Sequence, residues 1–504
     1  MFRTCLQECK NAVAFKRLHA SACSPPQGTE SRVFQSEKGV YQQRLISRRP
    51  LDGLESMFHE YHKTGIAFSY LLTPLKSKVP IREESLLRAL EMVSHLQPLL
   101  RARVTESPSY PAKYFETTER RTNFGFSVLD QDISNIEAIT EDIFASTKFD
   151  SDNGPIWKTV LIPGKFDPSS KLYTSGLALA ISHAVANGLS LPVILRQIIG
   201  CMEAISHGTA PKLQDIPSFP LFPSSADLLS LNLREFEPTK PSPPSADFIN
   251  PVLSEFPTVE NLPKISEPKT KVLIRTISAD EATWLLQQCR NNSCTITGAI
   301  LAACHFSFCS LLRKTSFPAE ATNDITCLTA VDRNHRPSLP FDYSACHYGS
   351  LTYNIPLTIQ NTNFWELAKS FSQGIKRDKR NDKDLEFLLR LEADRKGYMD
   401  HILSQGSLKL ASRQSSSLIL SNTGQYIFQN NPESSFRPQG LFVGTPIHKR
   451  FGTFGNYLMS LNGATHYMFC YDGSIISPEV AQRYSDGVWD VLQLQTRPAL
   501  QALH

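Results

Sequence analysis

Several features that would point to common functions are missing from this sequence of 504 residues. No run of about 18 apolar residues is present, which argues against a membrane-spanning helix. The closest segment, 296–312, contains His305 and is expected to form a buried core helix. The net charge is only +4. No arginine-rich stripe with interleaved aromatic residues occurs, so a nucleic-acid partner is not expected.

Metal, redox and nucleotide motifs are missing as well. The 11 cysteines form no CxxC pair. This pattern predicts reduced thiols inside the cell and argues against a structural zinc site. The phosphate-binding patterns GxxxxGK and GxGxxG and the nucleophile elbow GxSxG do not occur. His59 and His62 lack the spacing of a zinc protease, and they are expected on the surface of a helix.

What is present is the composition of a globular protein, with 41% apolar and 20% charged residues. The length allows two or three domains. A dense set of prolines in residues 207–269 predicts a linker, because proline interrupts helices and the interiors of sheets. The linker would separate an N-terminal subdomain (36–206) from a C-terminal one (270–500). Strands and helices alternate in both, which predicts an α/β fold of two similar subdomains.

The first 30 residues differ from the remainder of the chain. They are basic, and Glu8 is the only acidic residue before Glu30. Two interpretations stay open for residues 1–30. They form either a disordered tail, which leaves the protein in the cytoplasm, or a mitochondrial targeting segment.

The most informative stretch is 177–199. Its first five residues are apolar and predict a buried strand, and helical spacing follows the Asn187-Gly188 pair. An Asn-Gly pair tolerates the backbone angles that a sharp reversal needs. His183 is therefore expected where a core strand ends and a helix is about to begin, a place from which side chains reach into crevices. The alternative is an ordinary core histidine.

The segment Ser182–Gly188 resembles the HHxxxDG motif of a known superfamily. That superfamily includes chloramphenicol acetyltransferase, alcohol acyltransferases and the condensation domains of peptide synthetases. His183 matches the second histidine and Gly188 the glycine, whereas Asn187 stands where the family has aspartate. Further similarities follow in the family's order. QPLLR at 97–101 resembles HPxLR, and FD at 149–150 with GP at 154–155 resembles the FD…GP turn. SNTG at 421–424 resembles the SNxG sequence at a strand end, so a strand is expected to end there, and YDG at 471–473 resembles the family's last strand and helix.

The resemblance implies a fold and a site. Two chloramphenicol-acetyltransferase-like subdomains, each a mixed sheet flanked by helices, would form a V with a tunnel between them. His183 would act midway along it as the general base, with Asn187 and Gly188 shaping its loop. Ser421 and Asn422, or backbone N–H groups near Gly188, are candidate donors to the oxyanion. Acyl-CoA would be a co-substrate, no metal or redox cofactor would be used, and the protein would act as a monomer.

A histidine suits this chemistry. An imidazole with a pKa near 6.5 can take the proton of a hydroxyl group during its attack on a thioester, and can then pass that proton to the leaving thiol. In the family the aspartate usually pairs with an arginine. With Asn187 in its place, the corresponding arginine here, Arg333 or Arg336, would lose its partner or be solvated.

Three functions remain open. The favoured one is an acyl-CoA-dependent O-acyltransferase acting on an alcohol. The second is a free-standing condensation-type enzyme that uses a carrier-protein thioester and an amine or alcohol. The third, motivated by Asn187, is a catalytically degenerate protein that binds a small molecule or lipid.

Overall fold

The structure is a computed structural model. It describes residues 31–36, 39–63, 68–107, 110–118, 125–150, 154, 156–228, 269–313, 324–332, 339–340, 342–356, 363–393, 416–428, 434–447, 452–474 and 476–496. The N-terminal segment 1–30 and most of the proline-rich stretch lie outside these residues.

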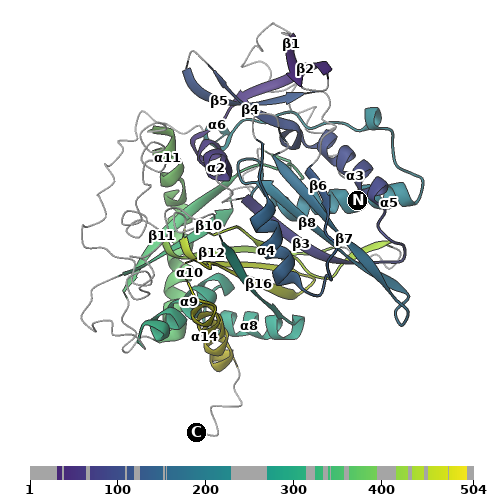
Figure 1. Ribbon diagram of the computed structural model, residues 1–504. Coiled ribbons are helices and arrows are strands. Elements are labelled where there is room, and N and C mark those ends of the chain that lie inside the picture. The colour runs from purple at the N-terminus through teal and green to yellow at the C-terminus, as the bar shows by residue number, and fades with distance from the viewer. Residues whose placement is uncertain are drawn as a thin grey trace.

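Two sheets organise the N-terminal half (Figure 1). A four-stranded sheet, in the order β1-β2-β5-β4, lies at one end of the molecule. The larger sheet contains β3, β8, β7 and β6, and helices α3 and α5 pack together beside it. The strands are β1 (Ser31–Ser36), β2 (Gly39–Pro50), β3 (Phe68–Ser77), β4 (Ala102–Ser107), β5 (Tyr110–Thr118), β6 (Gly125–Val128), β7 (Trp157–Asp167) and β8 (Leu172–Ser182); the helices are α2 (Gly53–Lys63), α3 (Glu83–Leu96), η1 (Pro98–Arg101), α4 (Ile136–Ser146), α5 (Ser190–Ser206), η2 (Leu213–Asp215) and α6 (Ser225–Leu228).

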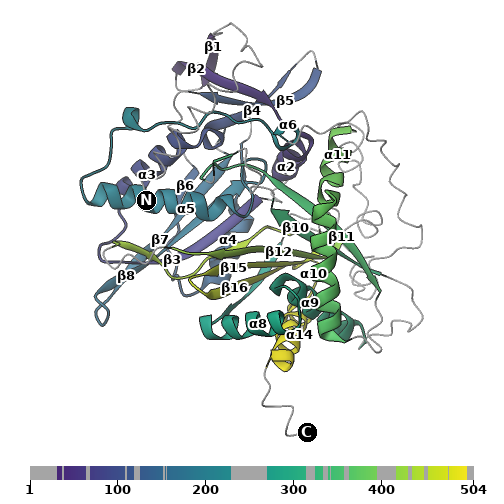
Figure 2. The ribbon, with the colours of Figure 1, turned by 180° about the vertical axis from the view of Figure 1, so that it is seen from behind.

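A six-stranded mixed sheet forms the centre of the C-terminal half, in the order β11-β10-β12-β15-β16-β9. Figure 2 shows α8, α9 and α14 grouped on one side of it. The strands are β9 (Thr270–Ile277), β10 (Asp324–Asp332), β11 (Tyr348–Pro356), β12 (Ser416–Tyr426), β13 (Phe436–Pro438), β14 (Phe442–Gly444), β15 (Gly452–Leu461) and β16 (Ala464–Asp472); the helices are α8 (Ala279–Asn291), α9 (Ile296–Arg313), α10 (Phe364–Arg380), η4 (Lys383–Leu385), α11 (Glu386–Ala393) and α14 (Pro478–Thr496).

Strand β8 carries the motif, and its sequence explains its position. It lies between β3 and β7 and pairs antiparallel with both. Residues 175–182 are buried without a break, as expected for a central strand that is covered on both faces. The chain then turns and enters α5 at Ser190, so His183 lies at the end of a core strand, as the sequence predicts.

The two halves are interlocked rather than simply adjacent. Strands β13 and β14 belong to the C-terminal half, yet both pair antiparallel with β3 and thereby extend the N-terminal sheet. The start of the proline-rich stretch also packs on the N-terminal half. There Phe219 is 2% exposed and its N–H donates to the Leu96 carbonyl oxygen at 3.0 Å. The strand pairing of β13 and β14 with β3 therefore joins the two halves along a shared interface.

Two expectations about single elements are wrong. Residues 421–424 do not end their strand, because β12 continues to Tyr426 through an irregularity in its pairing with β15. Gly424, with φ of +80°, supplies the left-handed backbone for it. His59 and His62 are 1% and 2% exposed, since this face of α2 packs inward.

The expected core helix at 296–312 is confirmed as α9, whose residues 299–304 are buried. Within the described part of the chain, no single helix has the length and apolarity of a membrane span. Among the helices that the structure describes, only the pair α8 and α9 reaches that length and composition, and the two are bent by 95° where they meet.

Helix α2 begins at a buried ion pair. The carboxylate of Glu55 accepts two hydrogen bonds of 2.7 Å from the Arg49 guanidinium, and also accepts the Asp52 N–H at 3.0 Å. Asp52 in turn accepts the Glu55 N–H at 2.8 Å, which completes a reciprocal cap. Glu55 is fully buried and Arg49 is 9% exposed, so each charge depends on the other.

Replacing Glu55 with glutamine should therefore lower the free energy of unfolding by about 3–5 kcal/mol, because Arg49 keeps a buried charge without its counterion. Urea unfolding followed by circular dichroism measures this change. Asp132→Asn is the matched control: its ion pair with Lys165 is also 2.7 Å long but lies at the surface, so stability should stay close to wild type. Equal stability of the two variants would contradict the prediction.

Candidate active site

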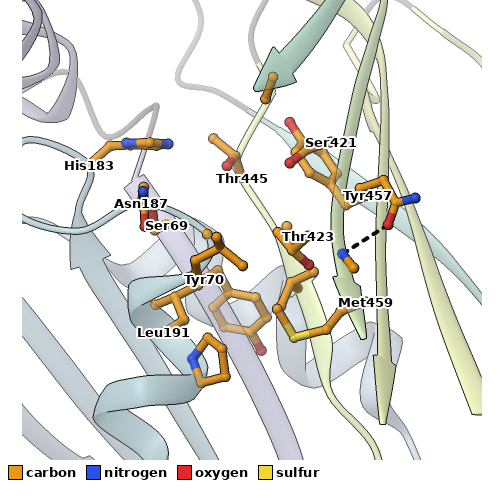
Figure 3. A pocket seen from close by; sticks show the side chains of 18 of the residues that line it. Ser69, Tyr70, His183, Asn187, Leu191, Ser421, Thr423, Thr445, Tyr457 and Met459 are labelled. Atoms are coloured by element: carbon orange, nitrogen blue, oxygen red, sulfur yellow. Dashed lines mark hydrogen bonds between the residues drawn. The ribbon is translucent and has the colours of Figure 1, made fainter. Parts of the chain in front are cut away.

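A cavity of about 460 Å³ lies between the two halves, and both line it. The N-terminal half contributes β3, the loop after β8 and the start of α5. The C-terminal half contributes β10, β12, β14 and β15. All five residues that the sequence singles out line this one cavity: His183, Asn187, Gly188, Ser421 and Asn422. In Figure 3 the His183 ring extends toward Thr445, with Ser421 and Thr423 also on the opposite side.

The His183 ring is held from several directions. Phe58 stacks on it with the ring centroids 4.2 Å apart and the planes 11° from parallel. The ring also forms a hydrogen bond with its own backbone. The Cys346 Sγ atom lies 3.9 Å from Nδ1. Phe58 and Cys346 therefore restrict the orientation of the ring.

Burial lowers the pKa of His183 from 6.5 to about 4, because the charged form loses its hydration. The ring is therefore neutral at pH 7. A neutral imidazole is the form that can accept a proton.

The Asn187 side chain forms hydrogen bonds through both its amide oxygen and its amide nitrogen. Its Oδ1 atom accepts hydrogen bonds from the Ser190 N–H at 3.0 Å and the Ser190 hydroxyl at 2.9 Å. Its Nδ2 atom donates to the carbonyl oxygen of His347 at 3.0 Å. An aspartate cannot make that last donation when it is ionised. The arginines considered as its partners, 333 and 336, lie outside the described residues.

A segment that the sequence analysis missed holds this loop in place. Residues 342–347, called here the docking segment, come from the C-terminal half and lie against the loop after β8. The Asn187 N–H donates to the Ala345 carbonyl oxygen at 3.1 Å, and the Ser344 hydroxyl donates to the Val185 carbonyl oxygen at 3.0 Å. Residues 183–189, called here the motif loop, thus form backbone hydrogen bonds with the other half.

Glutamines anchor the start of the docking segment. Gln97 accepts the Ser344 N–H at 3.0 Å and donates to the Asp342 carbonyl oxygen, and Gln197 donates to that same oxygen at 3.0 Å. Arg196 forms an ion pair with the Asp342 carboxylate. Gln97 is the residue that stands in for histidine in the HPxLR-like stretch. No local pattern marks 342–347, because it is an irregular segment defined only by its distant partners.

The C-terminal wall presents hydroxyl and amide groups. Asn422 Nδ2 donates to Thr297 Oγ1 at 3.1 Å, and its Oδ1 accepts the Gly424 N–H at 3.0 Å. Asn422 is therefore engaged with its own wall. Ser421 lies beside Tyr457 in the register of β12 and β15, and both line the cavity.

The two walls come close together at Gly188. A methyl group added there would lie 2.7 Å from the Thr423 methyl carbon, well inside van der Waals contact. Thr423 is held by a 2.8 Å hydrogen bond from its hydroxyl to the Leu458 carbonyl oxygen. Glycine is needed at this position because the opposite wall leaves no room for a side chain.

Gly188→Ala should consequently lower the free energy of unfolding by about 1–3 kcal/mol through overpacking. Adding Thr423→Ser should restore most of the loss, because serine keeps the hydroxyl but lacks the clashing methyl. Urea unfolding measures both. The control is Gly200→Ala in α5, where a methyl meets nothing within 4 Å and stability should not fall. Additive effects of the two substitutions would count against this close approach.

Comparison with known proteins agrees with the geometry. Residues 254–460 match the family model described as alcohol acetyltransferase. No curated protein is similar enough in sequence to count as a match.

Solved structures show the same fold at low sequence identity. The trichothecene 15-O-acetyltransferase TRI3 from Fusarium sporotrichioides is 12% identical with a TM-score of 0.64, over 94% of this chain and 100% of that chain. The condensation domain of the Monacolin K polyketide synthase MokA is 12% identical with a TM-score of 0.61, over 90% and 99% of the chains. The epimerization domain of tyrocidine synthetase B is 13% identical with a TM-score of 0.59, over 94% and 98%.

These matches confirm the predicted fold class, a mixed α/β structure of two subdomains with helices flanking the sheets. The chain therefore shares the fold of these acetyltransferase and condensation-domain structures, and its residues 254–460 match the alcohol acetyltransferase family model.

Proposed function

We propose that this protein is an acyltransferase that moves an acyl group from acyl-CoA to a neutral alcohol, with His183 as the general base. The alcohol acetyltransferase match, and an O-acetyltransferase among the structures of the same fold, support acyl transfer as the class of reaction. The observation that carries the proposal is a neutral, oriented histidine facing a cavity that both halves line.

The proposed reaction exchanges one bond at the acyl carbon. His183 Nε2 takes the proton of the acceptor hydroxyl while its oxygen attacks the thioester carbonyl carbon. The resulting tetrahedral oxyanion collapses, the carbon–sulfur bond breaks, and the protonated ring returns its proton to the departing thiolate. The products are an ester and CoA thiol, so the base is regenerated without any other reactant.

The oxyanion needs hydrogen-bond donors while it lasts. The Ser421 hydroxyl is the better of the two side-chain candidates, because the Asn422 amide nitrogen already donates to Thr297. Backbone N–H groups near Gly188 are the alternative. Tyr457, beside Ser421, supplies a second hydroxyl, and burial raises its pKa well above 10, so it stays protonated.

The charge of the lining favours an alcohol over an amine. Among the described residues that line the cavity, none is a carboxylate, and Lys379 is the only one with a charge. Most amines carry a positive charge at pH 7, and such an acceptor would lose its hydration here without gaining a counterion. A hydroxyl group is neutral and can bond to the serine and threonine hydroxyls of the C-terminal wall.

The first test removes the base. His183→Ala should lower kcat/KM by about 10²–10⁴-fold with acyl-CoA and a panel of alcohols, because general-base catalysis contributes that much to the rate. Release of free CoA thiol measures turnover. His207→Ala, an exposed histidine at the end of α5, is the matched control and should retain wild-type activity.

Two outcomes would overturn the proposal. One is equal turnover by His183→Ala and wild type. The other is activity only with acyl groups loaded on a carrier protein, which would favour the condensation-type alternative.

For the wild type, kcat/KM should stay level as the pH falls through 6.5, since the base becomes protonated only near its pKa of about 4.

A second test concerns Asn187 and decides whether the site is degenerate. Asn187→Asp should lower both turnover and stability, because a carboxylate oxygen would replace the Nδ2 donor that faces the His347 carbonyl oxygen. The loss of stability should be about 1–3 kcal/mol, as for a buried hydrogen bond whose partner is left unsatisfied. Thermal unfolding and the CoA-release assay measure the two effects. A marked rise in activity would instead support the degenerate binding protein.

A further inference from the structure

Helix α2 lies behind His183 and contacts the motif at two points. Phe58 stacks on the His183 ring. His62, one helical turn later and on the same face, places its Nδ1 atom 2.6 Å from the Ser182 hydroxyl oxygen. Ser182 directly precedes His183, so one face of α2 contacts both the ring and the residue next to it.

The Ser182 hydroxyl connects the two sides of His183. Besides the contact with His62, its oxygen accepts the N–H of Ala184 at 3.3 Å. A single buried hydroxyl therefore ties together the residues before and after the histidine. Ser182 is fully buried and His62 is 2% exposed, so water does not compete for these hydrogen bonds.

From these contacts we infer that His62 is a positioning residue for His183, acting through Ser182. This inference rests on the proposed function of His183. In the HHxxxDG pattern a histidine precedes the base, whereas this chain has Ser182 there and supplies an imidazole beside it from α2. The hydrogen bond fixes the backbone on both sides of His183, and this orients its ring toward the cavity.

The surroundings of His62 support a role in hydrogen bonding rather than in charge. Its ring packs edge-on against His59, at 5.0 Å, and Phe149, at 5.6 Å between ring centroids. Burial lowers its pKa to about 3, so it stays neutral at the pH of the reaction. Helix α2 is itself held at its start by the Arg49–Glu55 ion pair, which gives His62 a rigid support.

The test compares His62→Phe with His62→Asn. Phenylalanine keeps a packed ring but cannot bond to Ser182, whereas asparagine can place a polar nitrogen near the position of Nδ1. We expect His62→Phe to lower kcat by about 10- to 100-fold through misplacement of the base, with KM within about 3-fold of wild type. His62→Asn should recover much of kcat. Ser182→Ala should match His62→Phe, and the double variant should lose no more than either one.

A control and an activity-independent readout keep the outcomes distinct. His305→Phe removes a buried histidine in α9, away from the cavity, and should leave kcat unchanged. In spectra of protein with carbon-13-labelled histidine, His62→Phe should shift or broaden the His183 signal, identified by its loss in His183→Ala, while His62→Asn should not.

Each remaining result decides one of the two claims. If wild type turns over no thioester, the proposed function fails, and the His183 signal still decides whether His62 orients the ring. An unchanged kcat together with an unchanged His183 signal in His62→Phe would overturn the inference. So would additive losses in the double variant, because they would mean that His62 and Ser182 act independently.

Discussion

Attachment of the docking segment, residues 342–347, to the motif loop is the contact on which the site depends. The Asn187 N–H and side-chain amide bond to carbonyl oxygens of this segment, and Ser344 returns a bond to the loop. These groups are buried, so leaving them without partners would cost free energy that the loop alone cannot recover. The cavity has both of its walls only when the two halves are joined here. Strands β13 and β14, which extend the N-terminal sheet from the C-terminal half, reinforce the same interface.

Around this interface the electrostatics favour one kind of chemistry. Burial keeps His183 neutral, and Phe58 and the docking segment restrict its ring. The buried charges at the start of α2, Glu55 on the helix and Arg49 on β2, are paired with each other. The opposite wall supplies hydroxyl groups. A site with a neutral imidazole and uncharged hydrogen-bond donors can stabilise a transient oxyanion without strongly binding a charged ground state.

Much of the fold could be predicted from sequence because its signals are local. The apolar run before His183 marks a central strand, and the apolar segment 296–312 marks the core helix α9, where the structure has it. The parts that escaped prediction depend on partners distant in sequence. The docking segment has no periodicity, β13 and β14 are only three residues long, and the inward face of α2 is defined by the strand it covers. For that reason His62 was wrongly predicted to lie on the surface, since its partner Ser182 is 120 residues away in the sequence.

The same reasoning changes the meaning of Asn187. Compared with the family pattern alone, the loss of a carboxylate looks like the loss of an ion pair, and with it the support of the base. In the structure the group opposite its Nδ2 atom is a backbone carbonyl oxygen, which requires a donor, while Ser190 supplies the two donors that its oxygen requires. An amide satisfies both requirements, whereas a carboxylate satisfies only one. Asparagine is therefore the side chain that fits this interface, and its presence is compatible with the proposed role of His183 as a base.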